Sequence, residues 1–179
     1  MASAKSWLSG LQKRGLRFAV NYLAPFLLTH LLLPVIRKNV PARIVNVASA
    51  GQHFIDFDDV MLRQSYDGVR AYRQSKLALV MFTFDLAKEL QGSGVTVNCL
   101  HPATYMNTKM VHESGIKPLN SVEEGAGAIL YLAASPELEG KTGIYFDGKR
   151  PERADPQAYD NDARRNLWLL SQRLTKLLA

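Results

Sequence analysis

Cysteine is nearly absent from this sequence: among 179 residues the only one is Cys99, which lies within an apolar run. A single cysteine excludes a disulfide within the chain and a metal site built from several cysteines. We expect Cys99 to be a small buried side chain. The lack of disulfides favours a reducing compartment, the cytoplasm.

Acidic residues are missing from the start of the chain, where the first is Asp56, and the formal net charge of the whole is +6. The basic residues that precede it are Lys5, Lys13, Arg14, Arg17, Arg37, Lys38 and Arg43. Such character can suit nucleic acid, an acidic membrane surface or the phosphates of a dinucleotide. No basic stripe is interleaved with aromatic residues, so a nucleic-acid partner is not expected.

Charge of either sign is absent from residues 18–36. The length of this segment approaches that of a membrane span. It also contains polar and helix-interrupting residues, namely Asn21, Pro25, Thr29, His30 and Pro34. We therefore expect a helix buried in the core or interface of a globular protein, and membrane association is not expected.

One loop, 51–67, gathers residues of the kind that bind metals: His53, Asp56, Asp58 and Asp59. Their spacing fits neither a zinc template nor an EF-hand template. We expect a solvated loop whose carboxylates cap turns, and no bound metal.

Apolar runs and helical segments alternate along the rest of the chain. The run 42–48 is typical of a buried parallel strand, and further strands are expected at 95–100 and 142–148. A helix is expected from about 71 to 90, and a second one after the capping-box sequence of Ser121 and Glu124. This alternation predicts an α/β, Rossmann-like parallel sheet with flanking helices and right-handed crossovers.

The first of these helices carries Tyr72 and Lys76, four residues apart. That spacing places both side chains on one face, one turn from each other. An ammonium beside a phenol lowers the phenol's pKa from about 10, which suits general acid–base work. Taken alone the pattern is weak, because a half-buried tyrosine beside a solvated lysine is the commoner case.

The order of these features resembles the short-chain dehydrogenase/reductase superfamily, and most closely its retinol-dehydrogenase-like branch. The resemblance rests on a strand followed by Ser49, a helix with Tyr72 and Lys76, a further strand leading into His101 and Pro102, and the upstream segment 20–29. It covers residues 16–148. It implies an oxidoreductase that uses NAD or NADP and acts on a small carbonyl or alcohol substrate.

The resemblance also assigns roles to four residues. Tyr72 gives or takes the proton, and Lys76 lowers the pKa of that tyrosine and hydrogen-bonds the nicotinamide ribose. Ser49 hydrogen-bonds the substrate oxygen, and Asn21 holds a water in a proton relay. Two simpler roles stay open: Ser49 can cap the loop after its strand, and Asn21 can bond locally within its helix.

The loop after the second strand matches the part of the family that contacts the cofactor. The resemblance assigns Pro102, Thr104 and Tyr105 to the nicotinamide side and Thr108 to the phosphate. Ala103 stands where the family usually has glycine, and the loop is one residue longer before Thr108.

Glycine-rich phosphate-binding turns are absent: neither G-x-x-x-G-x-G nor G-x-G-x-x-G occurs in the sequence. In the family such a turn joins the first strand to a helix that holds the pyrophosphate. We therefore expect an amino-terminally truncated chain that lacks the amino-terminal half of the doubly wound fold. Its first strand would then present an unpaired edge.

Three parts follow: a basic tail without a match at 1–15, the family-like portion at 16–148, and a polar linker with a docking helix at 149–179. Three functions compete. The first is the oxidoreductase, expected as a homo-oligomer through the helices 16–37 and 70–91. The second is a non-catalytic remnant that associates through the same apolar helices. The third is a membrane-associated protein that uses residues 18–36.

Overall fold

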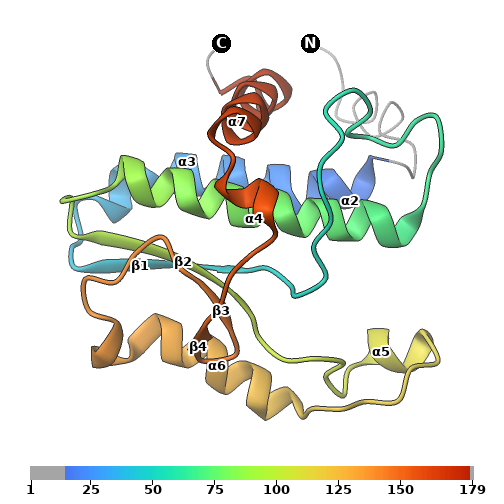
Figure 1. Ribbon diagram of the computed structural model, residues 1–179. Helices are drawn as coiled ribbons and strands as arrows, with labels where there is room; N and C mark the ends of the chain where they lie inside the picture. Colours follow the sequence, from blue (N-terminus) through green and yellow to red (C-terminus); the bar gives the residue numbers. More distant parts are fainter. Residues whose placement is uncertain (1–14, 178–179) are drawn as a thin grey trace.

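The computed structural model describes residues 15–177, in which four strands form one sheet with helices on both faces (Figure 1). The strands lie in the order β1 (Ala42–Val47), β2 (Val95–His101), β3 (Tyr145–Asp147) and β4 (Arg150–Pro151). The first three are parallel, and β4 pairs antiparallel with β3. The α/β, Rossmann-like class is therefore confirmed, although a tight turn at Gly148, with φ +58, makes the sheet mixed.

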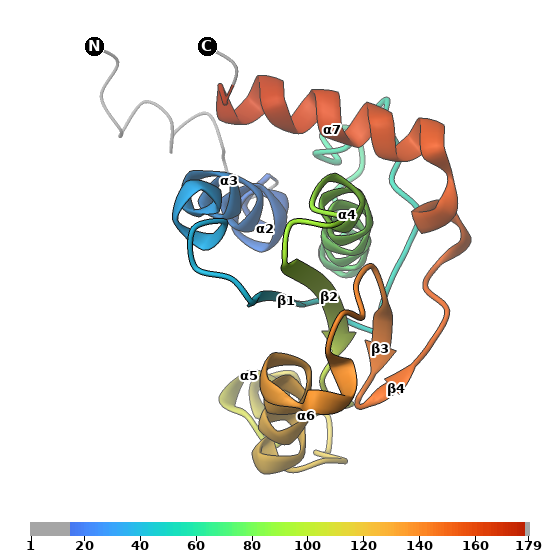
Figure 2. The ribbon, with the colours of Figure 1, turned by 90° about the vertical axis from the view of Figure 1, so that its left-hand side faces the viewer.

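The helices form two layers (Figure 2). One face of the sheet carries α2 (Leu16–Phe18), η1 (Ala19–Leu23), α3 (Ala24–Ile36), α4 (Gly68–Glu89) and, farther out, α7 (Asn161–Thr175). The other face carries α6 (Val122–Ala134), with α5 (Lys109–Glu113) beside it. Two short turns of 3-10 helix, η2 (Pro136–Leu138) and η3 (Pro156–Tyr159), complete the described chain.

Capping residues set the starts of the two principal helices. Asp67 accepts a hydrogen bond from the backbone N–H of Arg70 at 2.6 Å, which begins α4. The predicted capping box is confirmed: the Ser121 hydroxyl accepts from Glu124 N–H at 3.1 Å, and the Glu124 carboxylate accepts from Ser121 N–H at 2.7 Å. These bonds satisfy amides that a helix start leaves without a partner.

The core lies between α4 and its neighbours. Cys99 is fully buried, as expected, and burial raises the pKa of its thiol to about 12. Phe82 on α4 packs against Phe26 on α3, with ring centroids 5.1 Å apart, and Trp168 on α7 closes the same cluster. α7 is also tied to α4 by an ion pair of 3.1 Å between Arg164 and Asp85.

The continuous helical rod formed by α2, η1 and α3, called the α2–α3 rod below, differs from expectation in its burial. Only one side packs on the core, and only 17% of its most apolar window is buried. The rod, Leu16–Ile36, has 21 residues and a mean hydropathy of 1.7, so it is long and apolar enough to cross a membrane. One such helix near the start of a chain is weak support for a span, since core helices and signal sequences pass the same test.

The Tyr22→Phe substitution should lower the free energy of unfolding at pH 7 by about 1 kcal/mol, because it removes a 2.6 Å hydrogen bond to Ser171. Burial raises the pKa of Tyr22 above its unfolded value of about 10. The stabilisation linked to this proton is therefore complete below pH 10 and is lost as pH rises through the folded pKa. In urea unfolding at a series of rising pH values, the free energy of unfolding should fall less steeply above pH 10 in the variant than in the parent. Tyr66→Phe is the control, because Tyr66 is more exposed than Tyr22. The prediction would be contradicted if the free energy of unfolding of Tyr22→Phe fell with alkaline pH as steeply as that of the parent.

Candidate functional site

Ser49 lies just beyond the carboxyl end of β1 in a loop that is held from several sides. Its hydroxyl oxygen accepts from Gly51 N–H at 3.0 Å, and its carbonyl accepts from Gln52 at 3.0 Å and from the Tyr145 hydroxyl at 3.2 Å. Ser49 therefore does cap its loop. Among residues 15–177 its hydroxyl proton has no acceptor, so it can still donate to a bound oxygen.

Tyr72 and Lys76 share one face of α4, as their spacing predicts. The Lys76 Nζ atom lies 5.7 Å from the centroid of the Tyr72 ring. The same ammonium donates to the carbonyl of Val47 at 2.9 Å, at the end of β1 and two residues before Ser49. Burial lowers the pKa of Lys76. The fold thus brings the helix pair to the strand end that Ser49 follows.

Asn21 lies on the π-helical turn η1 and reaches across to α4. Its side-chain amide donates to the Ser75 hydroxyl at 3.0 Å, and that hydroxyl donates to the Tyr72 carbonyl at 2.7 Å. The bond joins two helices. The simpler alternative, a bond made locally within the helix of Asn21, is therefore wrong. Single π turns inside helices are frequent at functional sites. Asn21 therefore helps fix the turn of α4 that carries Tyr72.

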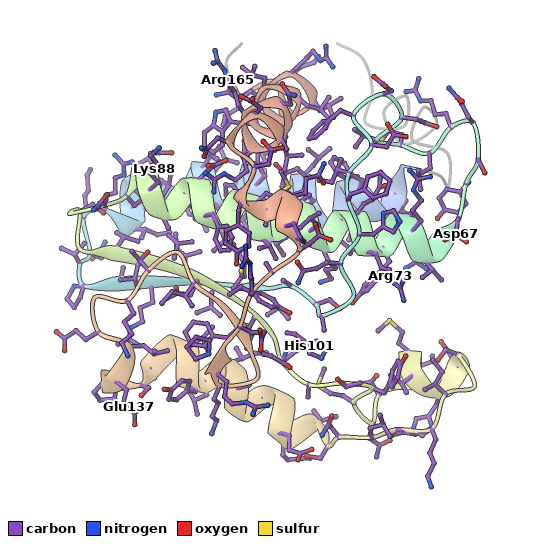
Figure 3. All side chains as sticks on the ribbon, in the orientation of Figure 1. Asp67, Arg73, Lys88, His101, Glu137 and Arg165 are labelled. Atoms are coloured by element: carbon purple, nitrogen blue, oxygen red, sulfur yellow. The ribbon has the colours of Figure 1, made fainter. Side chains whose placement is uncertain are left out.

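The loop after β2 begins at a buried Pro102 and is closed by Asn120. The side chain of Asn120 accepts from Thr104 N–H at 3.0 Å, and His101 Nε2 lies 3.0 Å from the Thr104 hydroxyl. Burial lowers the pKa of His101, which favours the neutral ring in this contact. Tyr105 has φ +43, and its side chain is exposed. Figure 3 labels His101 here and Arg73 on α4, both on the side where the strands end.

Thr108 is the residue before α5. Its carbonyl accepts from Val111 N–H and His112 N–H, both at 3.1 Å, and its side chain makes no capping bond. The hydroxyl is therefore available to a ligand. The structure places Thr104, Tyr105 and Thr108 along one exposed loop, and in the described part of the chain no hydrogen bond, ion pair or ring contact joins them to Tyr72 or Lys76.

The structure has a surface pocket of about 340 Å³ that the sequence analysis did not predict. It lies between the loop after β1 and the segment after β3, and its lining includes Gln52, Tyr145, Asp147, Glu152 and Arg153. Because the Tyr145 hydroxyl donates to the Ser49 carbonyl, the pocket adjoins the Ser49 loop. The expected topology could have predicted this pocket, because the carboxyl ends of parallel strands share one edge of the sheet and ligands bind beside that edge.

The loop 51–67 uses its carboxylates for turns. Asp56 accepts from Asp58 N–H at 3.1 Å, and Asp59 accepts from the N–H groups of Arg63 at 2.7 Å and Gln64 at 3.0 Å. Between residues 15 and 177 there is no group of three or more His, Cys, Asp or Glu side chains that could hold a metal.

Comparison with known proteins identifies the family of the chain. A family model described as short chain dehydrogenase matches residues 13–118. The chain is 40% identical over 180 residues to retinol dehydrogenase 13 of Mus musculus, and the match covers 90% of this chain and 54% of that protein. It is 41% identical over 177 residues to retinol dehydrogenase 14 of Homo sapiens, with 91% and 53% covered.

Solved structures show the same architecture. An uncharacterized protein from Mycobacterium Paratuberculosis aligns with a TM-score of 0.66 and 27% identity, over 89% of this chain and 58% of that one. An NADPH-bound carbonyl reductase from chicken fatty liver aligns with a TM-score of 0.58 and 25% identity, over 76% and 53%. The chain thus spans about half the length of the relatives it matches.

Proposed function

Because the chain belongs to the short-chain dehydrogenase family, in its retinol-dehydrogenase-like branch, we propose that it transfers a hydride between NAD or NADP and a carbonyl or alcohol substrate. The observation that carries the proposal is the position of the Lys76 ammonium. It lies 5.7 Å from the Tyr72 ring and is bonded to the strand end that precedes Ser49.

The proton chemistry falls to Tyr72. In carbonyl reduction its hydroxyl gives the proton to the substrate oxygen, and in alcohol oxidation the phenolate takes it back. The neighbouring Lys76 ammonium favours the phenolate. The Ser49 hydroxyl donates a hydrogen bond to the same substrate oxygen, where negative charge develops during reduction.

The residues present fit part of a nicotinamide cofactor. The Lys76 ammonium and the Thr104 and Thr108 hydroxyls can donate to ribose, carboxamide and phosphate oxygens, and the Thr108 hydroxyl is not used for capping. Pro102 and Tyr105 shape the backbone of the same loop. When bound, the cofactor supplies the hydride. The names of two relatives point to an apolar alcohol, and the structure of the chicken reductase contains NADPH.

The segment that follows the cofactor loop exposes apolar side chains, and the proposal assigns this segment to the substrate side of the site. Met110, Ile116 and Leu119 are 70%, 39% and 66% exposed on the segment that follows the cofactor loop. Apolar side chains that line a binding surface favour an apolar substrate. A suitable probe is retinal, the aldehyde that corresponds to the alcohol named in the relatives.

The Lys76→Met substitution should weaken the binding of NADH or NADPH by about 10- to 100-fold, the range for loss of a charged hydrogen bond. Calorimetric titration with each nucleotide measures this and also decides between them. Lys88→Met is the matched control, since Lys88 is an exposed lysine near the other end of α4 (Figure 3). Equal affinities in both variants would contradict the role proposed for Lys76.

A second candidate function is a non-catalytic chain that associates with other proteins. It is favoured by the absence of any glycine-rich phosphate-binding motif from the 179 residues. The same titration discriminates, because this candidate predicts binding of neither nucleotide. The cytoplasmic location stays a prediction, and recovery of the protein in the soluble fraction without detergent tests it together with the absence of membrane association.

A further inference from the structure

Two side chains donate hydrogen bonds to the carbonyl oxygen of Ser49. The Gln52 amide donates at 3.0 Å, and the Tyr145 hydroxyl donates at 3.2 Å. A carbonyl oxygen has two lone pairs, so these bonds satisfy it fully. Ser49 is 8% exposed and Tyr145 is 3% exposed. The bond between them therefore lies inside the fold and does not depend on what covers the surface around it.

Tyr145 reaches Ser49 from the other side of the sheet. It lies on β3, where it pairs with Cys99 of β2, and β2 separates β3 from β1 (Figure 2). Because a whole strand lies between the two residues, a long side chain that ends in a donor is needed to join them. Phenylalanine at position 145 would keep the ring in the core and lose the bond.

The position of the Ser49 hydroxyl depends on this carbonyl. The chain before Ser49 is fixed, because Ala48 N–H donates to the Leu100 carbonyl at 2.8 Å. A residue has two soft backbone dihedrals, and the direction of its carbonyl reports the second of them, ψ. Gly51 N–H then holds the Ser49 hydroxyl oxygen itself at 3.0 Å. Release of the carbonyl would let the turn from Ser49 to Gly51 rotate and would carry the hydroxyl with it.

The turn that Tyr145 holds packs against the helix that carries Tyr72. A methyl group on Gly51 would lie 3.5 Å from the Ser49 Oγ atom and 3.7 Å from the Cγ atom of Arg73, the residue after Tyr72. The Ser49 hydroxyl and this turn of α4 are therefore close neighbours. In the proposed function one substrate oxygen contacts the hydroxyls of both Ser49 and Tyr72. A displacement of about 1 Å in either hydroxyl can therefore slow the reaction strongly.

Tyr145 is suited to hold the turn and not to transfer a proton. Burial, followed by the charge of Asp147, raises the pKa of the Tyr145 hydroxyl above its ordinary value of about 10. The hydroxyl therefore stays a donor to Ser49 throughout the neutral pH range. Tyr145 also lies on a strand, whereas Gln52 belongs to the same loop as Ser49 and is itself tied to Asp155 N–H at 2.9 Å on another loop. A rigid element positions a site more accurately than a loop does.

We propose that Tyr145 is a positioning residue, whose hydrogen bond to the Ser49 carbonyl holds the Ser49 hydroxyl where the substrate oxygen binds. This inference rests on the proposed function, because it concerns the reaction assigned there to Ser49 and Tyr72. Tyr145 acts through Ser49 and does not itself contact the substrate oxygen.

A double-mutant cycle in retinal reduction tests whether Tyr145 acts through Ser49. Tyr145→Phe should lower the turnover number about tenfold and leave the KM for retinal and the affinity for the nucleotide unchanged. Ser49→Ala should lower the turnover number about 10²- to 10³-fold, the range for loss of a donor to a developing oxyanion. Addition of Tyr145→Phe to Ser49→Ala should then cause no further loss beyond about twofold.

Tyr131→Phe is the matched control for this cycle. It removes a tyrosine hydroxyl that donates to the Glu137 carboxylate at 2.8 Å, near the end of α6 on the other face of the sheet. It should leave the turnover number within about twofold of its background, with or without Ser49→Ala. If Tyr145→Phe reduced turnover by the same factor in both backgrounds, its effect would be independent of Ser49 and the inference would be wrong.

Hydrogen exchange of the Gly51 amide, followed by NMR, tests the same bond without any cofactor or substrate. Tyr145→Phe should speed this exchange about tenfold, because the turn that protects the amide is loosened. Tyr131→Phe should not change it. The Ala42 amide, bonded to the Gly94 carbonyl at 3.1 Å at the other end of β1, is the internal reference for a general loss of stability.

The two measurements separate this inference from the proposed function. Unchanged exchange at Gly51 in Tyr145→Phe would overturn the inference even if the parent chain reduces retinal. A parent chain that binds neither NADH nor NADPH would overturn the proposed function and, with it, a catalytic purpose for the bond. Faster exchange at Gly51 alone would then show that Tyr145 holds the turn for the fold and not for a reaction.

Discussion

Replacing Tyr72 by phenylalanine should lower the turnover number for retinal reduction by about 10²- to 10⁴-fold, the usual contribution of a positioned acid or base. The substitution removes only the hydroxyl, so the ring beside the Lys76 ammonium is retained. The affinity for the nicotinamide cofactor should therefore change little. Steady-state kinetics at saturating cofactor, combined with calorimetric titration, separates the two effects.

The matched control is Tyr66→Phe, which removes the hydroxyl of a tyrosine that is 38% exposed in the preceding loop. It should leave turnover within about twofold of the parent. If Tyr72→Phe kept the same turnover as this control, the proton would have to come from another group, and the role assigned to Tyr72 would be wrong.

Truncating Phe82 to alanine should cost about 3–5 kcal/mol of unfolding free energy, the range for large aromatic residues in a core. Phe82 is 1% exposed and lies where three helices meet. Its ring centroid is 5.1 Å from that of Phe26 on α3 and 6.5 Å from that of Trp168 on α7. Removal of the ring leaves a cavity that neither neighbour can fill without moving its helix. Urea unfolding, monitored by circular dichroism, measures the change in the free energy of unfolding.

Phe54→Ala provides the comparison, since this ring is 52% exposed and its described contacts include the guanidinium of Arg70 at 5.6 Å. A cation–π contact at such a site contributes about 0.5–1 kcal/mol. Similar losses in the two variants would show that α3, α4 and α7 do not depend on a shared core.

The regular elements could be predicted because their signals are local. The expected strands 42–48 and 95–100 differ by one residue from β1 and β2, and the expected helix 71–90 overlaps nearly all of α4. A strand was expected at 142–148, and the observed strand β3 is shorter, spanning only Tyr145–Asp147. There the Thr142 hydroxyl and Gly143 N–H bond the backbone of Val97 at 2.9 Å and 2.8 Å, outside a regular ladder.

The residue types of the candidate site follow from patterns in the sequence, but the contacts among these residues do not. The four-residue spacing of Tyr72 and Lys76 places them on one face of any helix. That Lys76 bonds the Val47 carbonyl depends on how α4 crosses the sheet, which no local pattern encodes. Likewise, no local pattern in the sequence marks the π turn at Asn21 or the positive φ of Tyr105.

The loop after β2 is joined to the chain before α6 by short backbone bonds. Leu119 N–H donates to the Tyr105 carbonyl and Asn107 N–H to the Asn120 carbonyl, both at 3.0 Å. The eleven residues between Asn107 and Leu119, 108–118, therefore leave and re-enter the molecule at one narrow neck. Evolution can lengthen, shorten or exchange that excursion without moving the sheet. Under the proposed function, substrate preference can thus diverge between relatives while α4, which carries Tyr72 and Lys76, stays the same.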